Sequence, residues 1–181
     1  MQLAQGAALE LFIERGFDEV TVAEIAASAG MAASTVYRYF STKEAILLWD
    51  EHDHAIDKAL TQRLRRQPPF EAVRDALIET LGDRYDNDDR SQLRRIQFIY
   101  ATEQVHAAAV EADLRDRQKL TAAIEGRLSK PNKSAAAVIA GSALLAVDVA
   151  MERWQENDGR QPLAKLLEGV FDQLGHLETL A

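Results

Sequence analysis

The chain has 181 residues, with 21 lysines and arginines against 29 aspartates and glutamates, which gives a net charge of −8. Hydrophobic residues make up 47% of the chain, enough to bury a core in one ordinary domain or two small ones. The absence of cysteine excludes disulfides, thiolate zinc sites and a cysteine nucleophile. With no leader pattern and no apolar run of ~20 residues, we expect a cytoplasmic protein without a membrane anchor.

Helical periodicity dominates the chain, and no window shows the sustained alternation that a strand needs. Most glycines and prolines stand where one helix should end or the next begin. The sequence therefore predicts an all-α fold of about nine helices. Their expected ranges are near 2–15, 21–29, 33–39, 42–66, 68–86, 90–104, 106–129, 133–156 and 162–179.

Two helix starts carry a capping signature. Thr21 and Glu24 have the spacing of a capping box, in which each side chain bonds the backbone amide of the other residue. Val20 and Ile25 flank this box at the positions of a hydrophobic staple. A second box is predicted at 41–44, so we expect helices to begin at 21 and 41.

Between these two starts, the chain should form two short helices joined by a tight turn. Gly30 can adopt the left-handed backbone conformation that ends the first helix and changes the direction of the chain. The second helix should cover 33–39, with Val36 and Phe40 turned inward. Two short helices around a glycine turn form a helix-turn-helix.

Residues 7–48 read AALELFIERGFDEVTVAEIAASAGMAASTVYRYFSTKEAILL. They contain an AxxLF helix, a glycine followed by an aromatic residue, TVxxIA, AG, STVYxYF and TKE, in that order. This segment resembles the DNA-binding domain of the tetracycline-repressor (TetR) family of bacterial transcription regulators. The resemblance implies a DNA-binding domain at 1–46, followed by a ligand-binding and dimerisation domain at 47–181.

The resemblance also implies which side chains meet DNA, because a short helix fits the major groove while hydroxyls and cations hold phosphates. The groove-facing residues would be Ala33, Ser34 and Tyr37. The residues beside the phosphates would be Thr21, Thr35, Arg38, Tyr39 and Lys43. Other interpretations stay open: the tyrosines could pack in the core, the cations could be solvated surface charges, and Thr21 could act as a cap alone.

The charge of this domain departs from the usual pattern. Residues 1–45 carry three basic and six acidic residues, and 3 − 6 gives a net charge of −3, which is unusual for a domain that binds a polyanion. The sequence therefore leaves an alternative open, a helical dimerisation or ligand-binding module that no longer binds DNA. The charged residues counted are Arg15, Arg38, Lys43, Glu10, Glu14, Asp18, Glu19, Glu24 and Glu44.

The resemblance implies a homodimer that binds a palindromic double-stranded operator, and the last two helices suit the dimer interface. The helix at 133–156 has a face of small residues that allows close helix packing, and the helix at 162–179 carries a leucine-rich stripe. A twofold pair matches two half-sites on DNA. An intramolecular helix pair is the alternative for the same residues. The residues expected at the dimer interface are Ala140, Leu144, Leu163, Leu167, Val170, Phe171 and Leu174.

The family resemblance implies an unidentified small-molecule effector bound among the middle helices. Polar groups within apolar helical stretches are the best sequence markers of such a pocket. Each marker could equally be a hydrogen-bonded structural residue. The candidate effector-binding residues are Arg95, Tyr100, Gln104 and Asp148.

Enzyme chemistry finds no support in the sequence. It contains no nucleophile elbow, phosphate loop or paired carboxylates in a suitable context. His52 and His54 are two positions apart and point to different sides of a helix, so they cannot form the usual metal-binding pair. We therefore expect no enzymatic activity, no metal and no cofactor.

Overall fold

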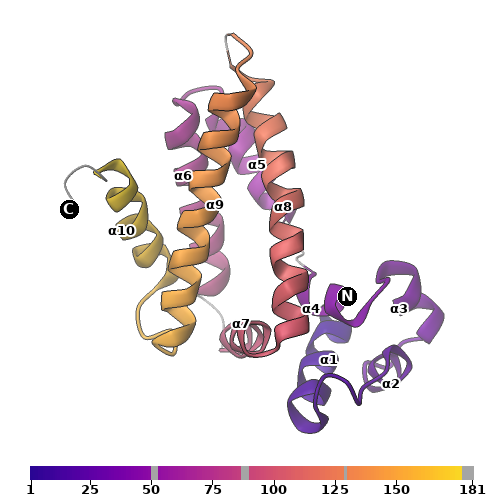
Figure 1. Ribbon diagram of the computed structural model, residues 1–181. Coiled ribbons are helices and arrows are strands. Elements are labelled where there is room, and N and C mark those ends of the chain that lie inside the picture. Colours follow the sequence, from indigo (N-terminus) through magenta and orange to yellow (C-terminus); the bar gives the residue numbers. More distant parts are fainter. Residues whose placement is uncertain (50–52, 87–89, 129, 177–181) are drawn as a thin grey trace. The chain divides into compact units, whose positions relative to one another are not determined.

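The computed structural model describes residues 1–49, 53–86, 90–128 and 130–176, and within these ranges every regular element is a helix (Figure 1). The all-α prediction is confirmed, with ten described helices rather than about nine. They are α1 (Gln2–Arg15), α2 (Val22–Ser28), α3 (Ala33–Tyr39), α4 (Lys43–Leu48), α5 (Asp53–Arg63), α6 (Pro69–Tyr85), α7 (Ser91–Ala101), α8 (Glu103–Glu125), α9 (Lys133–Glu156) and α10 (Leu163–Gly175).

The additional helix arises because the expected helix from 42 to 66 is not continuous. Helix α4 ends at Leu48, and Trp49 has extended dihedral angles, φ −61° and ψ 132°. Helix α5 ends at Arg63, short of the expected boundary at 66. The periodicity gave no sign of this break, because Trp49 fits an apolar helical face whether or not the helix continues.

The chain divides into two compact units. The first unit consists of described residues within 1–50 and 94–111, and the second of those within 51–93 and 112–181. The core of the first unit lies under α1, where the ring of Phe12 stacks on Phe98 at 5.9 Å and tilts against Phe17 at 4.9 Å, centroid to centroid. Helices α7 and α8 each contribute residues to both units.

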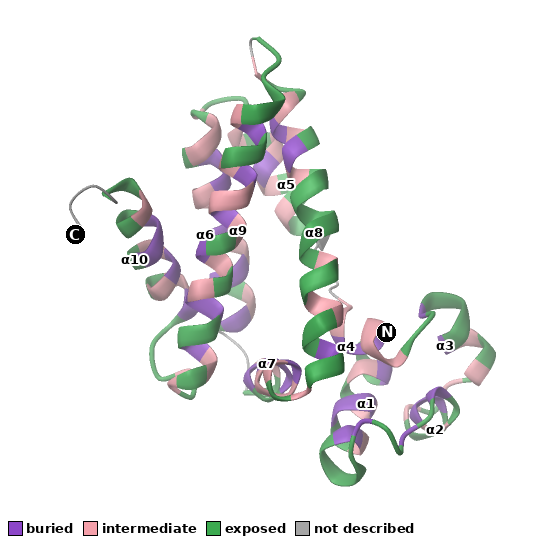
Figure 2. Cartoon of the chain, viewed as in Figure 1, coloured by how far each residue is buried: buried purple, intermediate pink, exposed green. Residues whose placement is uncertain are grey.

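In the second unit, α9 packs against α10 and α6 through a row of alanines, and Figure 2 shows buried residues recurring along these helices. The alanines are small enough to let the helix axes approach closely. Asp86 fixes the start of α10, because its carboxylate accepts hydrogen bonds from the backbone amides of Leu163 (2.5 Å) and Ala164 (3.2 Å). The buried alanines of α9 are Ala136, Ala140, Ala143, Ala146 and Ala150.

Most residues expected at a dimer interface are buried within the single chain. The alternative of an intramolecular helix pair therefore describes them, since an amphipathic stripe does not reveal which surface covers it. Leu144 and Leu174 are half-buried. The residues buried inside the single chain are Ala140, Leu163, Leu167, Val170 and Phe171.

Helix α9 also bears on the expectation that the protein has no membrane anchor. Among the described residues, α9 is the one helix that is long and apolar enough to cross a membrane, by length and composition only, whereas we expected no apolar run of that length. A core helix can meet the same criteria. The alanine row of α9 is buried against α6 and α10, and 28% of the most apolar stretch of this helix is buried inside the chain.

Candidate nucleic-acid interface

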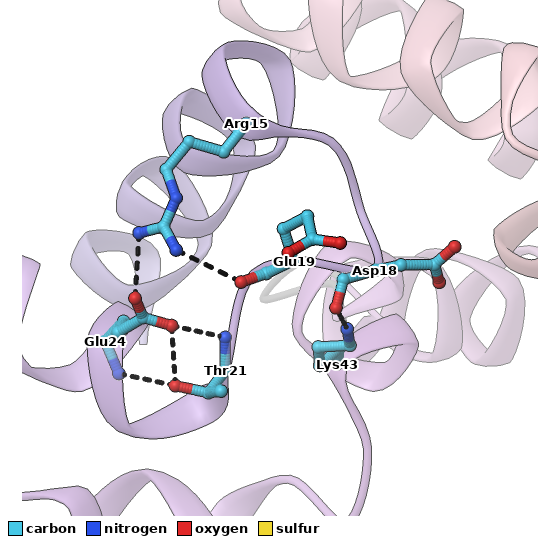
Figure 3. A network of polar contacts seen from close by, with 6 residues as sticks. All are labelled: Arg15, Asp18, Glu19, Thr21, Glu24 and Lys43. Carbon is cyan, nitrogen blue, oxygen red and sulfur yellow. Dashed lines mark hydrogen bonds and ion pairs between the residues drawn. The ribbon is translucent and has the colours of Figure 1, made fainter.

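The helix-turn-helix begins with the predicted capping box. The backbone amide of Thr21 donates to Glu24 Oε2 at 2.8 Å, and the backbone amide of Glu24 donates to Thr21 Oγ1 at 3.3 Å (Figure 3). Val20 and Ile25 are buried beside it, as the staple requires. Gly30 has a φ of 66°, so the turn before α3 uses the left-handed conformation open to glycine. The box and the turn are both confirmed.

Glu24 is also held by the end of α1. Arg15 Nη1 lies 2.8 Å from Glu24 Oε1, and Arg15 Nη2 donates to the Glu19 carbonyl at 3.1 Å (Figure 3). Hydrogen bonds from the Thr21 hydroxyl and amide, and then from Arg15, lower the pKa of Glu24 from 4.5 to about 2. One acidic residue of the −3 domain therefore joins α1 to α2 and is not an unpaired surface charge.

The second predicted helix start is wrong by one residue. Thr42 is the N-cap of α4, and its Oγ1 accepts from the backbone amide of Ala45 at 3.2 Å. Phe40 ends α3 with extended backbone angles and is buried. Ser41 and Thr42 are both exposed, and they connect the buried Phe40 to the first residue of α4.

Helix α3 divides into an anchored side and an open side. Val36 and Phe40 are buried, as predicted. Tyr37 and Tyr39 are 56% and 59% exposed, so neither is a core aromatic. Arg38 is exposed, with its guanidinium carbon 5.4 Å from the centre of the Tyr39 ring. The other sequence-predicted residues of α3 are Ser34, which is exposed, and Ala33 and Thr35, which are half-buried.

Lys43 makes an internal contact that the sequence did not indicate. Its ammonium donates to the carbonyls of Phe17 at 2.7 Å and Asp18 at 3.4 Å, and lies 4.5 Å from the centre of the Phe17 ring. These bonds account for a lysine at a helix start, where the helix dipole disfavours a positive charge. They join α4 to the segment that follows α1 (Figure 3).

The carboxyl end of α4 is held by two side chains from other helices. The Gln5 amide nitrogen lies 3.1, 3.0 and 2.8 Å from the carbonyl oxygens of Ile46, Leu47 and Trp49. Arg95 Nη1 donates to the carbonyls of Leu47 at 3.0 Å and Trp49 at 3.3 Å. We call Gln5 and Arg95, with the three carbonyls they bond, the α4 clamp. Arg95, a candidate effector ligand, thus has a structural role in this unit.

The other candidate effector residues are described each within its own unit, Tyr100 and Gln104 in the first and Asp148 in the second. Tyr100 stacks on His106 with 5.1 Å between ring centres. Gln104 and Asp148 are exposed. Across the four described stretches of the chain, no group of three or more His, Asp or Glu side chains is placed to hold a metal ion.

The second unit contains an apolar cavity of about 160 Å³ that the sequence analysis did not locate. A charged group stands at its wall, where Lys119 pairs with Asp116 at 2.8 Å. Of the residues named from the sequence, only Leu144 lines it, and Leu144 was expected at the dimer interface. The signal available in the sequence was the set of inward-facing apolar positions on four helices, α5, α6, α8 and α9. The lining residues are Ile56, Asp57, Leu60, Val73, Ala76, Leu77, Asp116, Lys119, Leu120, Ala123 and Leu144.

Comparison with known proteins identifies the family. The model for bacterial regulatory proteins of the tetR family matches residues 6–48, and that for the MftR C-terminal domain matches residues 67–177. The chain belongs to the TetR family of transcriptional regulators. A Mycobacterium tuberculosis protein named as a mycofactocin biosynthesis transcriptional regulator, MftR, is 45% identical over 47 residues. This match spans 26% of the chain and 24% of the relative's length.

Solved structures of two transcriptional regulators share the fold. Thermus thermophilus FadR, a TetR-family repressor in complex with lauroyl-CoA, aligns with a TM-score of 0.53 and 24% identity over 99% of this chain and 94% of that one. Bacillus subtilis FadR in complex with stearoyl-CoA aligns with a TM-score of 0.53 and 20% identity over 96% of each chain. At these identities the similarity establishes the fold alone.

The capping box predicts how the first unit responds to acid. Because the pKa of Glu24 is about 2 in the folded chain and 4.5 ordinarily, its contribution to stability is complete above pH 4.5 and is lost as the pH falls toward 2. An NMR titration should place the Glu24 carboxyl near 2, and Glu24→Gln should remove this part of the acid dependence of unfolding. A Glu24 midpoint near 4.5 would contradict the described network.

Proposed function

We propose that this protein is a transcriptional repressor that places α3 in the major groove of operator DNA. One observation carries the proposal: α3 is anchored through Val36 and Phe40, which are buried, while Ser34, Tyr37 and Arg38 are exposed. A short helix with this arrangement presents side chains to base edges. The family membership supports the same role.

The side chains of α3 make two kinds of contact with DNA in this proposal, some with bases and some with phosphates. Ser34 and Tyr37 read base edges, and Ala33 contacts a thymine methyl group. Arg38 and Tyr39 lie along the phosphates, and their contacts fix the register of the protein without reading sequence. Thr21, Thr35 and Lys43 complete the phosphate contacts. For Lys43 this requires the ammonium to bond a phosphate beside the carbonyls that it already contacts.

The repressor acts as a homodimer on a palindromic operator, as twofold symmetry favours. The proposed interface uses the side of α9 that the chain leaves uncovered, where Val138 and Leu145 are 64% and 55% exposed. They are seven positions apart, which is two helical turns, so they share one face. Gly141 and Ser142 lie between them and allow a second helix to approach closely.

The effector binds in the apolar cavity and carries a hydrocarbon group. Leu60, Leu77 and Leu120 give the cavity walls the apolar character of ligand pockets. Two proteins of the same fold have been solved with fatty acyl thioesters, lauroyl-CoA and stearoyl-CoA. We therefore assign the effector to the acyl thioesters, whose chain would enter the cavity.

Effector binding releases the operator. A ligand that binds one conformation more tightly shifts the population toward it, by no more than the difference in its two affinities. The released conformation holds its two α3 helices at the wrong separation for the half-sites. Such a regulator works in the cytoplasm, where its DNA is.

Substitutions on α3 should separate base reading from phosphate contact. Tyr37→Ala should change the order of preference among operator variants, because it removes a groove-facing side chain. Tyr39→Phe should weaken binding to all sequences alike, because it removes a phosphate hydrogen bond. Mobility-shift titrations across operator variants and salt concentrations measure both effects. A wild-type chain that binds no DNA even at low salt would favour a module without DNA binding.

A matched pair of substitutions on α8 tests the effector cavity. Ala123 lines the cavity, whereas its neighbour Ala122 is exposed. Ala123→Leu should fill the cavity and abolish the release of operator DNA by lauroyl-CoA, while Ala122→Leu should leave release unchanged. Mobility-shift assays with added lauroyl-CoA measure this, and circular dichroism checks folding. Equal release from both variants would place the effector elsewhere.

One substitution on α9 tests the dimer surface. Leu145→Glu should yield monomers in analytical ultracentrifugation, because it sets a charge in the centre of the proposed interface. Leu3→Glu makes the same change at a leucine that is 73% exposed on α1, and this variant should remain dimeric. Dimers of unchanged affinity in Leu145→Glu would rule out this face of α9.

A further inference from the structure

The carboxyl end of helix α4 carries backbone carbonyls that have no hydrogen-bond donor within the helix. The last four carbonyls of a helix have no partner within the helix and must be bonded by side chains, backbone or water. Here the α4 clamp supplies donors from α1 and α7 to three acceptors at this end of the helix, the carbonyls of Ile46, Leu47 and Trp49. Arg95 is only 5% exposed, so its bonds are shielded from water. The clamp therefore fixes the position of Trp49.

Trp49 connects the clamp to the recognition helix α3. Its ring meets the ring of Phe40 edge-on, with 6.5 Å between centroids. Phe40 ends α3, and its backbone amide donates to the Val36 carbonyl at 2.9 Å. A displacement of Trp49 would remove a wall of the pocket that holds Phe40. The end of α4 and the end of α3 are therefore positioned by the same contacts.

The clamp also lies where the chain passes from one compact unit to the other. The units divide after residue 50 and before residue 94. Trp49 is the last described residue before the first of these points, and Arg95 is the second residue after the other. The hydrogen bond between them therefore joins, within the first unit, the two segments of chain that continue into the second unit.

We propose that Gln5 and Arg95 are positioning residues for DNA reading, which hold α3 in its operator-binding orientation by bonding the carboxyl end of α4. The proposal rests on the DNA-binding function proposed above. Neither residue contacts DNA in this account. Arg95 acts through Trp49 and Phe40, and Gln5 acts through the same carbonyls from α1.

The neighbouring arginine provides a matched control. Arg94 precedes Arg95 on α7 and pairs with Glu10 of α1 at 2.8 and 3.1 Å. That pair is exposed, with side-chain exposures of 47% and 63%, and exposed pairs contribute little to stability. Arg94→Met and Arg95→Met remove the same charge from adjacent positions, but only the second opens the clamp.

The experiment measures operator affinity at a temperature where each variant is fully folded by circular dichroism. Arg95→Met should raise the operator dissociation constant about tenfold, because α3 loses its preferred orientation, and Arg94→Met should leave it within about twofold. The slope of log affinity against log salt should stay at the wild-type value in both variants, because the clamp makes no phosphate contact. Wild-type affinity in a folded Arg95→Met variant would overturn the proposal.

Gln5→Leu provides the second variant in case Arg95→Met does not fold. It removes the α1 side of the clamp from a half-buried position, and operator affinity should fall about threefold or more. Gln2→Leu makes the same change at an exposed position of α1 and should have no effect on affinity. Equal affinities for these two variants would also overturn the proposal.

Tryptophan fluorescence tests the clamp without DNA. The chain contains two tryptophans, so Trp154→Phe leaves Trp49 as the only reporter. In this background Arg95→Met should shift the Trp49 emission to longer wavelength, and Arg94→Met should not. A shift without loss of operator affinity would show that the clamp exists but does not position α3. If the wild-type chain bound no operator, the proposed function would fail while the fluorescence result still tested the clamp.

Discussion

The DNA-binding region depends on three very short helices, and hydrogen bonds to the backbone groups at their ends stabilise them. Helices α2, α3 and α4 have 7, 7 and 6 residues, whereas isolated helices shorter than about 12–15 residues are marginal in water. Side chains bond the open backbone groups at both ends of this region: Thr21 at the start of α2, and Gln5 with Arg95 at the end of α4. Tertiary contacts therefore supply the order that these helices lack alone.

The same constraint explains how an acidic domain can have a DNA-reading surface. Two of its carboxylates are paired within the domain, Glu24 in the capping box and Glu10 with Arg94 at the surface. Lys43 likewise bonds two backbone carbonyls. The groups left exposed on α3 are a serine, two tyrosines and an arginine, which suit contact with bases and phosphates. The overall charge of the domain is thus a poor guide to this one face.

Local spacing predicted the local structure well, and distant contacts were beyond its reach. The Thr21–Glu24 box, the turn at Gly30 and the inward position of Val36 all depend on residues a few positions apart. The α4 clamp joins residues 41 to 48 positions apart, and no periodicity marks such a pair. The leucine stripe of α10 was correctly apolar, but a stripe does not specify whether its own chain or a second copy covers it. The cavity in the second unit was not predicted because the apolar residues of a helix likewise do not show whether they pack against other side chains or line a cavity.

Amide hydrogen exchange, measured residue by residue on the full chain, tests the central claim that the end of α4 supports α3. In Arg95→Met, protection should fall in α4 and at the Phe40 amide that closes α3, while the amides of α6, α9 and α10 keep their wild-type rates. Loss of protection confined to the turn of α7 around residue 95, with α3 and α4 unchanged, would contradict the account.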